Sequence, residues 1–119
     1  MTIAALRNNL GGAIIDGGAR DRQEIEERGF PIFCKSFVPS AGGRLVTIGY
    51  NIPIICGVVL INPGDYIFGD DDGVVVIPQN RLGEILSLAE KIEDSERKIM
   101  KYLKEGHKLT EAVDKFRIK

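Results

Sequence analysis

The sequence predicts an α/β protein in which short strands form β layers and one long helix follows toward the C-terminal end. Between residues 13 and 77, β-branched and aromatic runs alternate with Gly, Pro, Asn and Asp, which is typical of short strands joined by turns. From residue 81 onward, apolar residues recur every three or four positions, which is typical of an amphipathic helix.

Each run predicts one element. The expected strands are Ala13–Ile15, Ile32–Phe37, Arg44–Tyr50, Ile54–Ile61, Tyr66–Gly69 and Val74–Ile77. The expected helices are the last turns of one within Met1–Leu10, a short polar helix over Asp21–Arg28, a long helix over Arg81–Glu105 and a short amphipathic helix over Leu109–Phe116. Asn80 is expected to cap the start of the long helix, and Gly106 its end. We expect a tight turn at Asp16-Gly17-Gly18 and a bulge at Gly57.

Length and composition indicate one ordinary domain, residues 1–119, with 81–119 as a helical extension. The chain has 119 residues, 44% hydrophobic and 28% charged, with a net charge of −1, so neither a disordered chain nor a polycation for nucleic acid is expected. No apolar run approaches the length of a membrane span, and we expect a cytoplasmic protein. Cys34 and Cys56 lie in apolar runs without metal-binding spacing and are expected to be buried free thiols.

Several familiar motifs are excluded. The acidic run Asp70-Asp71-Asp72 lacks the EF-hand pattern, because the twelfth position holds Arg81 instead of Glu, so a polar turn is expected. His107 is the single histidine and is expected to be solvated, which leaves no catalytic triad and no histidine metal site. The glycine pairs do not match a nucleotide-binding pattern.

The pair Arg20-Asp21 has two interpretations. In the first, Asp21 caps the following helix, with Glu24 completing a capping box, and Arg20 is simply exposed. In the second, a strand passes through glycines into charged groups, which is where α/β proteins often bind ligands. Asp21 would then offer a hard divalent cation one oxygen ligand, and Arg20 would grip a substrate carboxylate through two parallel hydrogen bonds. Together they could hold a 2-oxo acid and stabilise an enolate.

Five segments form an ordered set of motifs. They are Asp16-Gly17-Gly18-Ala19-Arg20-Asp21, Phe30-Pro31-Ile32-Phe33, Asn51-Ile52-Pro53-Ile54, Pro63-Gly64-Asp65 and Asp70-Asp71-Asp72-Gly73-Val74-Val75-Val76-Ile77-Pro78. Together they resemble the RraA-like family, which contains the regulator of ribonuclease activity A and the 4-hydroxy-4-methyl-2-oxoglutarate aldolases, formerly labelled demethylmenaquinone methyltransferases. The resemblance runs from about Met1 to Pro78.

The resemblance implies a swivelling β/β/α fold, trimers or hexamers, and active sites between subunits. It assigns Arg20 to the pyruvyl carboxylate and Asp21 to magnesium or manganese. Aldolases of the family carry an acidic residue that is separated from the Arg-Asp pair by twenty positions. Here that position falls before Met1, so we expect the chain to lack the N-terminal part of the family's domain, including this acid.

Two functions remain open. The first is a divalent-metal-dependent lyase that cleaves 4-hydroxy-2-oxo acids to pyruvate and also decarboxylates oxaloacetate, using Arg20 and Asp21. The alternative is a non-catalytic binding protein that modulates a ribonuclease. Neither interpretation calls for membrane or direct nucleic-acid binding. A homo-oligomer is expected in both, because a helix of ~37 Å is longer than the small sheet beside it needs.

Overall fold

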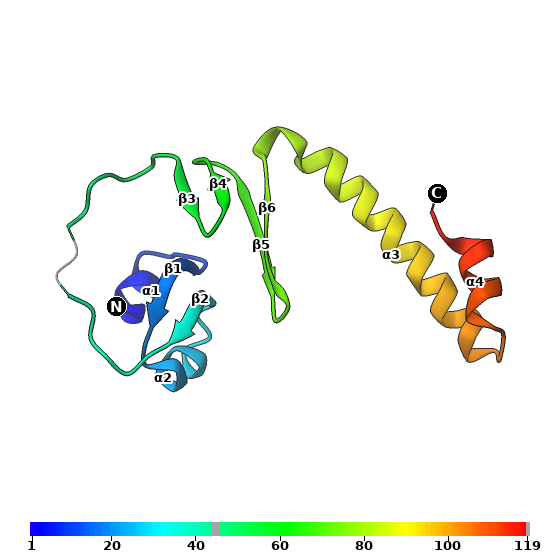
Figure 1. Cartoon of the computed structure of the whole chain (residues 1–119), viewed down its shortest axis with the longest axis horizontal. Coiled ribbons are helices and arrows are strands. Elements are labelled where there is room, and N and C mark those ends of the chain that lie inside the picture. The colour runs from blue at the N-terminus through cyan, green and yellow to red at the C-terminus, as the bar shows by residue number, and fades with distance from the viewer. Residues whose placement is uncertain (44–45, 119) are drawn as a thin grey trace. The chain divides into compact units, whose positions relative to one another are not determined.

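The structure is a computed structural model that describes residues 1–43 and 46–118 (Figure 1). Eleven elements follow one another among these residues, and the chain divides into two compact units, Met1–Val76 and Ile77–Lys119. The first unit contains short strands and two short helices, and the second contains a long helix and a shorter one, which confirms the predicted α/β class with a long C-terminal helix. Each unit is described by itself below.

The first unit begins with α1 (Thr2–Arg7) and continues into a strand–helix–strand motif. Strand β1 (Ala13–Ala19) and strand β2 (Ile32–Phe37) pair in parallel, and α2 (Arg22–Glu27) forms the crossover between them. A parallel pair requires such a crossover, because its second strand must start at the same end as the first. The carboxyl end of β1 therefore leads directly into the first turn of α2.

The predicted turn at Asp16-Gly17-Gly18 is wrong, because β1 continues through these residues to Ala19. The pairing of β1 with β2 shifts in register at these residues: Ile15 pairs with Cys34, whereas Gly18, three residues after Ile15, pairs with Ser36, which is only two residues after Cys34. Glycine matters here for space and not for positive φ. A Cβ atom on Gly18 would lie 2.8 Å from a methyl group of Val38, so a larger residue would displace the chain after β2.

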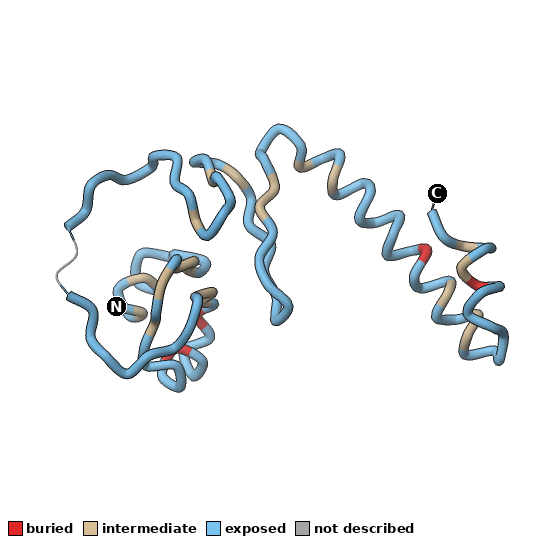
Figure 2. Tube along the Cα trace, in the orientation of Figure 1, coloured by how far each residue is buried: buried red, intermediate tan, exposed pale blue. Residues whose placement is uncertain are grey.

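The core of this unit is small. Ile25 of α2 and Phe30, which precedes β2, are 6% and 5% exposed and are its buried apolar residues among those described (Figure 2). Gly29 ends α2 with φ of 62°, a left-handed conformation that glycine adopts without strain. This turn directs Phe30 back beneath the helix.

The predicted single strand Ile54–Ile61 is instead a hairpin. Strand β3 (Ile54–Cys56) and strand β4 (Val59–Ile61) pair antiparallel, with Cys56 opposite Val59. The two-residue connection begins at Gly57, whose φ is 62°. A glycine with positive φ at the first position of a two-residue loop reverses the chain, so Gly57 forms a turn and not a bulge.

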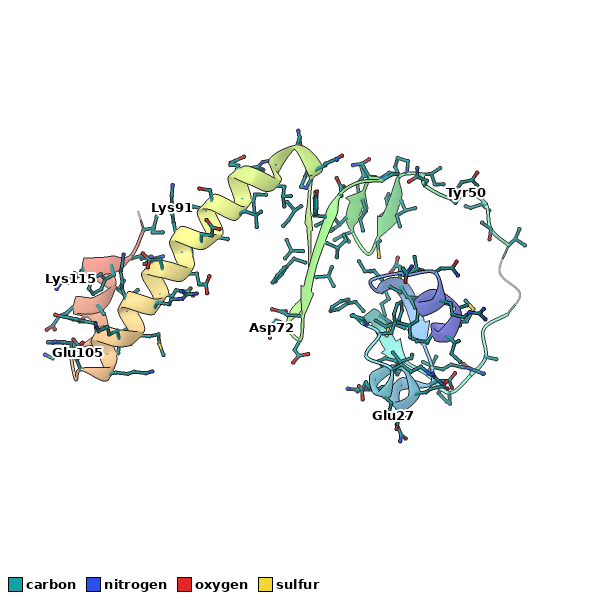
Figure 3. The ribbon with its side chains drawn as sticks, turned by 180° about the vertical axis from the view of Figure 1, so that it is seen from behind. Glu27, Tyr50, Asp72, Lys91, Glu105 and Lys115 are labelled. Carbon is teal, nitrogen blue, oxygen red and sulfur yellow. The ribbon has the colours of Figure 1, made fainter. Side chains whose placement is uncertain are left out.

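A second hairpin follows, formed by β5 (Tyr66–Asp70) and β6 (Gly73–Ile77), close to the predicted bounds. The predicted polar turn is confirmed at its tip, where one Asp70 carboxylate oxygen accepts the N–H groups of Asp72 at 2.9 Å and Gly73 at 3.2 Å. Figure 3 shows Asp72 at this tip. The hairpin meets β2 where the Phe33 ring lies against Gly69, so closely that a Cβ atom there would be 2.5 Å from the ring.

The predicted strand Arg44–Tyr50 is not formed over its described part. Residues 44 and 45 lie outside the described residues, and 46–50 contain no strand. Val46, Ile48 and Tyr50 alternate as in a half-buried strand, yet they are 82%, 95% and 88% exposed. Alternating apolar residues show only that one face of a strand could be buried. A strand also needs a neighbouring strand to pair with, and this segment has none among the described residues.

The second unit is a helical hairpin. A short 3₁₀ turn, η1 (Gln79–Arg81), leads into α3 (Leu82–Lys104), and α4 (Leu109–Phe116) folds back against it. This confirms the predicted long helix, whose 23 residues span ~35 Å. The reversal lies at Gly106, with φ of 92°, as predicted for the helix end. Ala112 is completely buried, and Ser95, which is 8% exposed, donates its hydroxyl hydrogen to the backbone carbonyl of Phe116.

Three smaller predictions need correction. Cys34 and Cys56 are free, but both are half-buried, because pairing covers the edges of a strand and leaves the faces that carry its side chains partly open. Asn80 does not cap α3, whose N-cap position is Arg81, without a side-chain hydrogen bond. His107 is exposed, yet its ring stacks on Tyr102 with centroids 3.8 Å apart, so it is not simply solvated. Among the described residues, no helix combines the length and the apolar character that a membrane span requires.

Candidate functional site

A cavity of about 340 Å³ lies where β1 ends and α2 begins. Arg20, Asp21 and Glu24 form its charged part, and Ile15 and Ile32 form part of its apolar wall. The carboxyl end of a parallel strand and the start of the following helix are frequent sites of ligand binding, because loops and side chains converge there. The structure thus brings Arg20 and Asp21, which the sequence singled out, to one cavity.

Asp21 has an unusual backbone conformation. It occupies the N-cap position of α2, but its φ of 66° and ψ of 39° are left-handed, and its side chain makes no capping hydrogen bond. A left-handed residue that carries a Cβ atom is strained, and such strain often occurs at functional sites. The predicted capping box is therefore wrong, and Asp21 keeps a carboxylate that the helix does not use.

The Asp21 carboxylate is near Arg20 instead, with 3.4 Å between Arg20 Nε and Asp21 Oδ2. The two side chains are 50% and 58% exposed, so solvent screens this pair, and its contribution to stability is at most ~1 kcal/mol. In the described part of the chain, the terminal guanidinium nitrogens of Arg20 have no protein acceptor. These nitrogens remain available for a carboxylate ligand.

Glu24 is the residue that the sequence interpretation missed, because it was assigned to a capping box. It lines the same cavity and accepts two hydrogen bonds from Arg28, from Nε at 3.1 Å and Nη2 at 2.9 Å. Glu24 follows Asp21 by three residues, which places the two on the same side of a helix, and this spacing could have identified Glu24 as part of the same cavity. The cavity therefore holds two carboxylates and one guanidinium.

An ion pair fixes the strand that leads to this site. Asp16 Oδ1 lies 2.5 Å from Lys35 Nζ, at the register shift between β1 and β2. The hydrogen bond from Lys35 holds the pKa of Asp16 below its ordinary value, with help from the Gly57 N–H, and Asp16 in turn raises the pKa of Lys35. Both groups are therefore charged at neutral pH, and they join the two strands where the regular pairing is interrupted.

The donor set restricts which metal could bind. Among the described residues, no group of three or more His, Cys, Asp or Glu side chains is arranged to hold a metal ion. A zinc site of four protein ligands is thus not formed by this part of the chain. Magnesium commonly binds through one or two carboxylates and keeps several waters, and Asp21 in an open cavity fits that requirement.

Comparisons with known proteins identify the family of this chain. Residues 1–76 match the RraA-like family model, described as Aldolase/RraA. An uncharacterized protein of Methanocaldococcus jannaschii is 40% identical over 87% of this chain and 50% of its own length. A Halalkalibacterium halodurans protein provisionally named 4-hydroxy-4-methyl-2-oxoglutarate aldolase is 40% identical over 69% of this chain and 39% of its own length.

Two solved structures share the fold. An uncharacterized Pseudomonas syringae protein is 34% identical, with a TM-score of 0.85 over 94% of this chain and 56% of that one. Streptomyces coelicolor RraAS2, described as an unusual member of the RNase ES inhibitor RraA family, is 37% identical, with a TM-score of 0.63 over 76% of this chain and 48% of that one. The chain spans half or less of the length of the two curated relatives described above. By the family model and these relatives, the chain belongs to the RraA-like, or aldolase/RraA, family.

Proposed function

We propose that this chain carries part of the active site of a divalent-metal-dependent lyase that cleaves 4-hydroxy-2-oxo acids to pyruvate. The observation that supports this most directly is the position of Arg20 and Asp21 on one cavity, with Asp21 strained and not used as a helix cap. The name of the Halalkalibacterium halodurans relative supports the substrate class. Oxaloacetate decarboxylation is a side reaction that uses the same residues.

Arg20 binds and orients the substrate. Its planar guanidinium can donate two parallel hydrogen bonds to the C1 carboxylate, and this grip fixes the plane of the neighbouring 2-oxo group. Because Arg20 and Asp21 are adjacent on the cavity wall, the 2-oxo oxygen then lies toward Asp21. Binding a 2-oxo acid requires Arg20 to leave its 3.4 Å contact with Asp21, which is weak because both side chains are half exposed.

Asp21 would hold magnesium or manganese through one carboxylate oxygen, with water as the remaining ligands. The cation, when bound, supplies positive charge beside the 2-oxo group. Cleavage of the C3–C4 bond leaves its electron pair on the pyruvate fragment as an enolate, and the 4-hydroxyl gives its proton to solvent water as the new carbonyl forms. Protonation of the fragment at C3 gives pyruvate. In this scheme Arg20 holds the fragment in place throughout.

The test is pyruvate release by the purified protein from 4-hydroxy-4-methyl-2-oxoglutarate, followed by NADH oxidation with lactate dehydrogenase. Activity should require magnesium or manganese, stop with a chelator and return when the metal is restored. A folded protein that releases no pyruvate with either metal and also binds pyruvate no better than Arg20→Ala does would overturn the proposal. Binding of pyruvate by wild type and by Arg20→Ala separates loss of substrate binding from loss of turnover.

A second candidate is modulation of a ribonuclease, which the description of the Streptomyces coelicolor protein as a family member of an RNase inhibitor supports. Such a function would act through the protein surface and would not need the Arg20-Asp21 cavity. Titration of the protein into an RNA cleavage reaction tests it. Equal inhibition by wild type and by Arg20→Ala, without pyruvate release, would favour this candidate over the lyase.

A further inference from the structure

The cavity at the end of β1 offers a substrate a single positive side chain. Among the described residues that line it, Arg20 is the one cation, whereas Asp21 and Glu24 are anions. A 2-oxo acid that binds Arg20 through its C1 carboxylate uses this cation, because the carboxylate takes both parallel N–H groups of the guanidinium. A second carboxylate on the same substrate would need another cation.

The arginines at the two ends of α2 do not supply it. Arg22 Nε lies 2.6 Å from Glu26, and Arg28 donates to one Glu24 oxygen from Nε at 3.1 Å and from Nη2 at 2.9 Å. Neither arginine lines the cavity, whereas Glu24 does. The pair of Glu24 and Arg28 therefore presents a carboxylate, and not a guanidinium, to a bound ligand. A substrate carboxylate near Glu24 meets a group of its own charge, which is unfavourable.

The rest of the cavity is mainly apolar. Ala13 pairs with Ile32, and Ile15 follows Ala13 by two residues, so Ile15 and Ile32 extend from the same face of the β1–β2 pair. Ile25 of α2 and Ile3 of α1 line the cavity as well. An alkyl group placed against these branched side chains is removed from water, which favours binding. A carboxylate placed there loses its hydration and gains no partner in return.

We propose that this cavity selects 2-oxo acids that have one carboxylate and an uncharged, apolar tail, and that Glu24 excludes those with a second carboxylate. This selectivity rests on the proposed lyase function and narrows its substrate class. A tail that extends beyond Arg20 and Asp21 meets mainly Glu24 and apolar side chains, and neither provides a cation for a second carboxylate. Such specificity depends on an unfavourable contact with the wrong ligand as well as on a favourable contact with the right one.

This selectivity determines the second product of the cleavage. The favoured substrate is a 4-hydroxy-2-oxo monocarboxylic acid with an alkyl group on C4. When its C3–C4 bond breaks, the electron pair stays on the pyruvate fragment, which is protonated at C3, and the 4-hydroxyl proton goes to solvent water. The C4 fragment then leaves as an uncharged aldehyde or ketone. Thus 4-hydroxy-4-methyl-2-oxopentanoate gives pyruvate and acetone, and the cavity favours it over 4-hydroxy-4-methyl-2-oxoglutarate, which carries a second carboxylate.

The experiment measures the binding of three 2-oxo acids, none of which can undergo this cleavage, to the full chain by isothermal titration calorimetry with magnesium present. Pyruvate has no tail, 2-oxopentanoate has an apolar tail, and 2-oxoglutarate has a tail of similar length that ends in a carboxylate. 2-Oxopentanoate should bind ~5-fold tighter than pyruvate, because its two additional carbons reach the apolar wall. It should bind at least ~10-fold tighter than 2-oxoglutarate, whose second carboxylate lacks a cation.

Two variants of α2 test the role of Glu24. Glu24→Gln removes the charge, keeps the shape and weakens the hold on Arg28, so the preference for 2-oxopentanoate over 2-oxoglutarate should fall to ~3-fold or less. The Glu24 side chain is 56% exposed, so this replacement should leave α2 folded. Glu27→Gln is the matched control. Glu27 is the last residue of α2 (Figure 3), accepts a hydrogen bond from Gln23 and does not line the cavity, so this variant should keep the wild-type preference.

Equal affinities for 2-oxopentanoate and 2-oxoglutarate, or tighter binding of 2-oxoglutarate, would overturn the selectivity. If that binding is lost in Arg20→Ala, the proposed lyase site still stands, and the selectivity alone is refuted. If no 2-oxo acid binds wild type better than it binds Arg20→Ala, both fail together. An unchanged preference in Glu24→Gln, or an equal change in Glu27→Gln, would also overturn the proposal, because the Glu24 charge would then not be what excludes a second carboxylate.

Discussion

Asp21 offers the sharpest test of the site, because its backbone and its side chain lead to different expectations. With φ of 66° and ψ of 39°, it is left-handed, and it makes no capping hydrogen bond to α2. We predict that Asp21→Gly is more stable than Asp21→Thr. A capping role predicts equal stability for these two variants, because threonine and glycine are nearly equivalent as N-caps.

The size of the stability difference between Asp21→Gly and Asp21→Thr follows from the left-handed backbone at this position. A residue with a Cβ atom in the left-handed region is strained by ~1–2 kcal/mol, and β-branched threonine falls at the upper end. Glycine avoids this strain but loses ~0.5–1 kcal/mol through the greater freedom of its unfolded state. The difference leaves Asp21→Gly more stable than Asp21→Thr by about 1 kcal/mol. The half-exposed pair with Arg20 is lost in both variants and cancels.

The assay is urea unfolding followed by circular dichroism, combined with the pyruvate assay on the same preparations. Both variants lack the carboxylate, so neither should release pyruvate, and Asp21→Asn should keep wild-type stability while it also loses activity. Equal unfolding free energies for the glycine and threonine variants would refute the argument from the backbone. Pyruvate release by Asp21→Gly would refute the role of the carboxylate.

Three further predictions concern neighbouring parts of the structure. Arg20→Lys should retain the charge but lower pyruvate release at least ~10-fold, because a point charge replaces a two-pronged grip; steady-state kinetics measures this. Gly69→Ala should lower the unfolding free energy by ~1–3 kcal/mol, because its Cβ atom would overlap the Phe33 ring. Because Lys35 depresses the pKa of Asp16, the contribution of Asp16 to stability is present above pH 3.8, the ordinary value, and is lost as pH falls below it. Asp16→Asn should therefore remove part of the stability difference between pH 5 and pH 3.

Gly69→Ala has a matched control variant, and the other two predictions each have a result that would contradict them. Gly83→Ala, on α3 with open space around it, should raise stability by up to ~1 kcal/mol, so a loss there would mean that alanine is harmful for a reason other than contact. Wild-type kinetics from Arg20→Lys would show that a simple positive charge is sufficient. An unchanged acid transition in Asp16→Asn would show that the ion pair with Lys35 does not contribute to stability.

The sequence predicted the main helices and most strands, because their signals are local. The helical stripe of α3 and the glycine at Gly106 predict where that helix runs and ends, and both agree with the structure. Gly57 misled the prediction, since one glycine inside an apolar run is compatible with a bulge and with a turn. Only the pairing of Cys56 with Val59 distinguishes the two, and pairing is not visible in one chain segment.

The candidate site was predictable in its residues but not in its geometry. Arg20 and Asp21 stand out in the sequence as a guanidinium beside a carboxylate after glycines. The left-handed backbone of Asp21 depends on how β1 joins α2, which residue types do not reveal. Glu24 matched a capping box by spacing, and only the structure shows that it pairs with Arg28 at the cavity instead.

The six strands have a consequence for amide exchange. They form three separate two-stranded sheets, so among the described residues every strand is paired along one side only. The backbone groups along the other side are not paired with a described strand, and such edges are templates for added strands. In the isolated chain, hydrogen–deuterium exchange of the β2 amides should alternate along the strand. Amides that donate a hydrogen bond to β1 should exchange slowly, and the amides between them, which point away from β1, should exchange fast. Any polypeptide that adds a strand at this edge would be detected as slowing of the fast set, residue by residue.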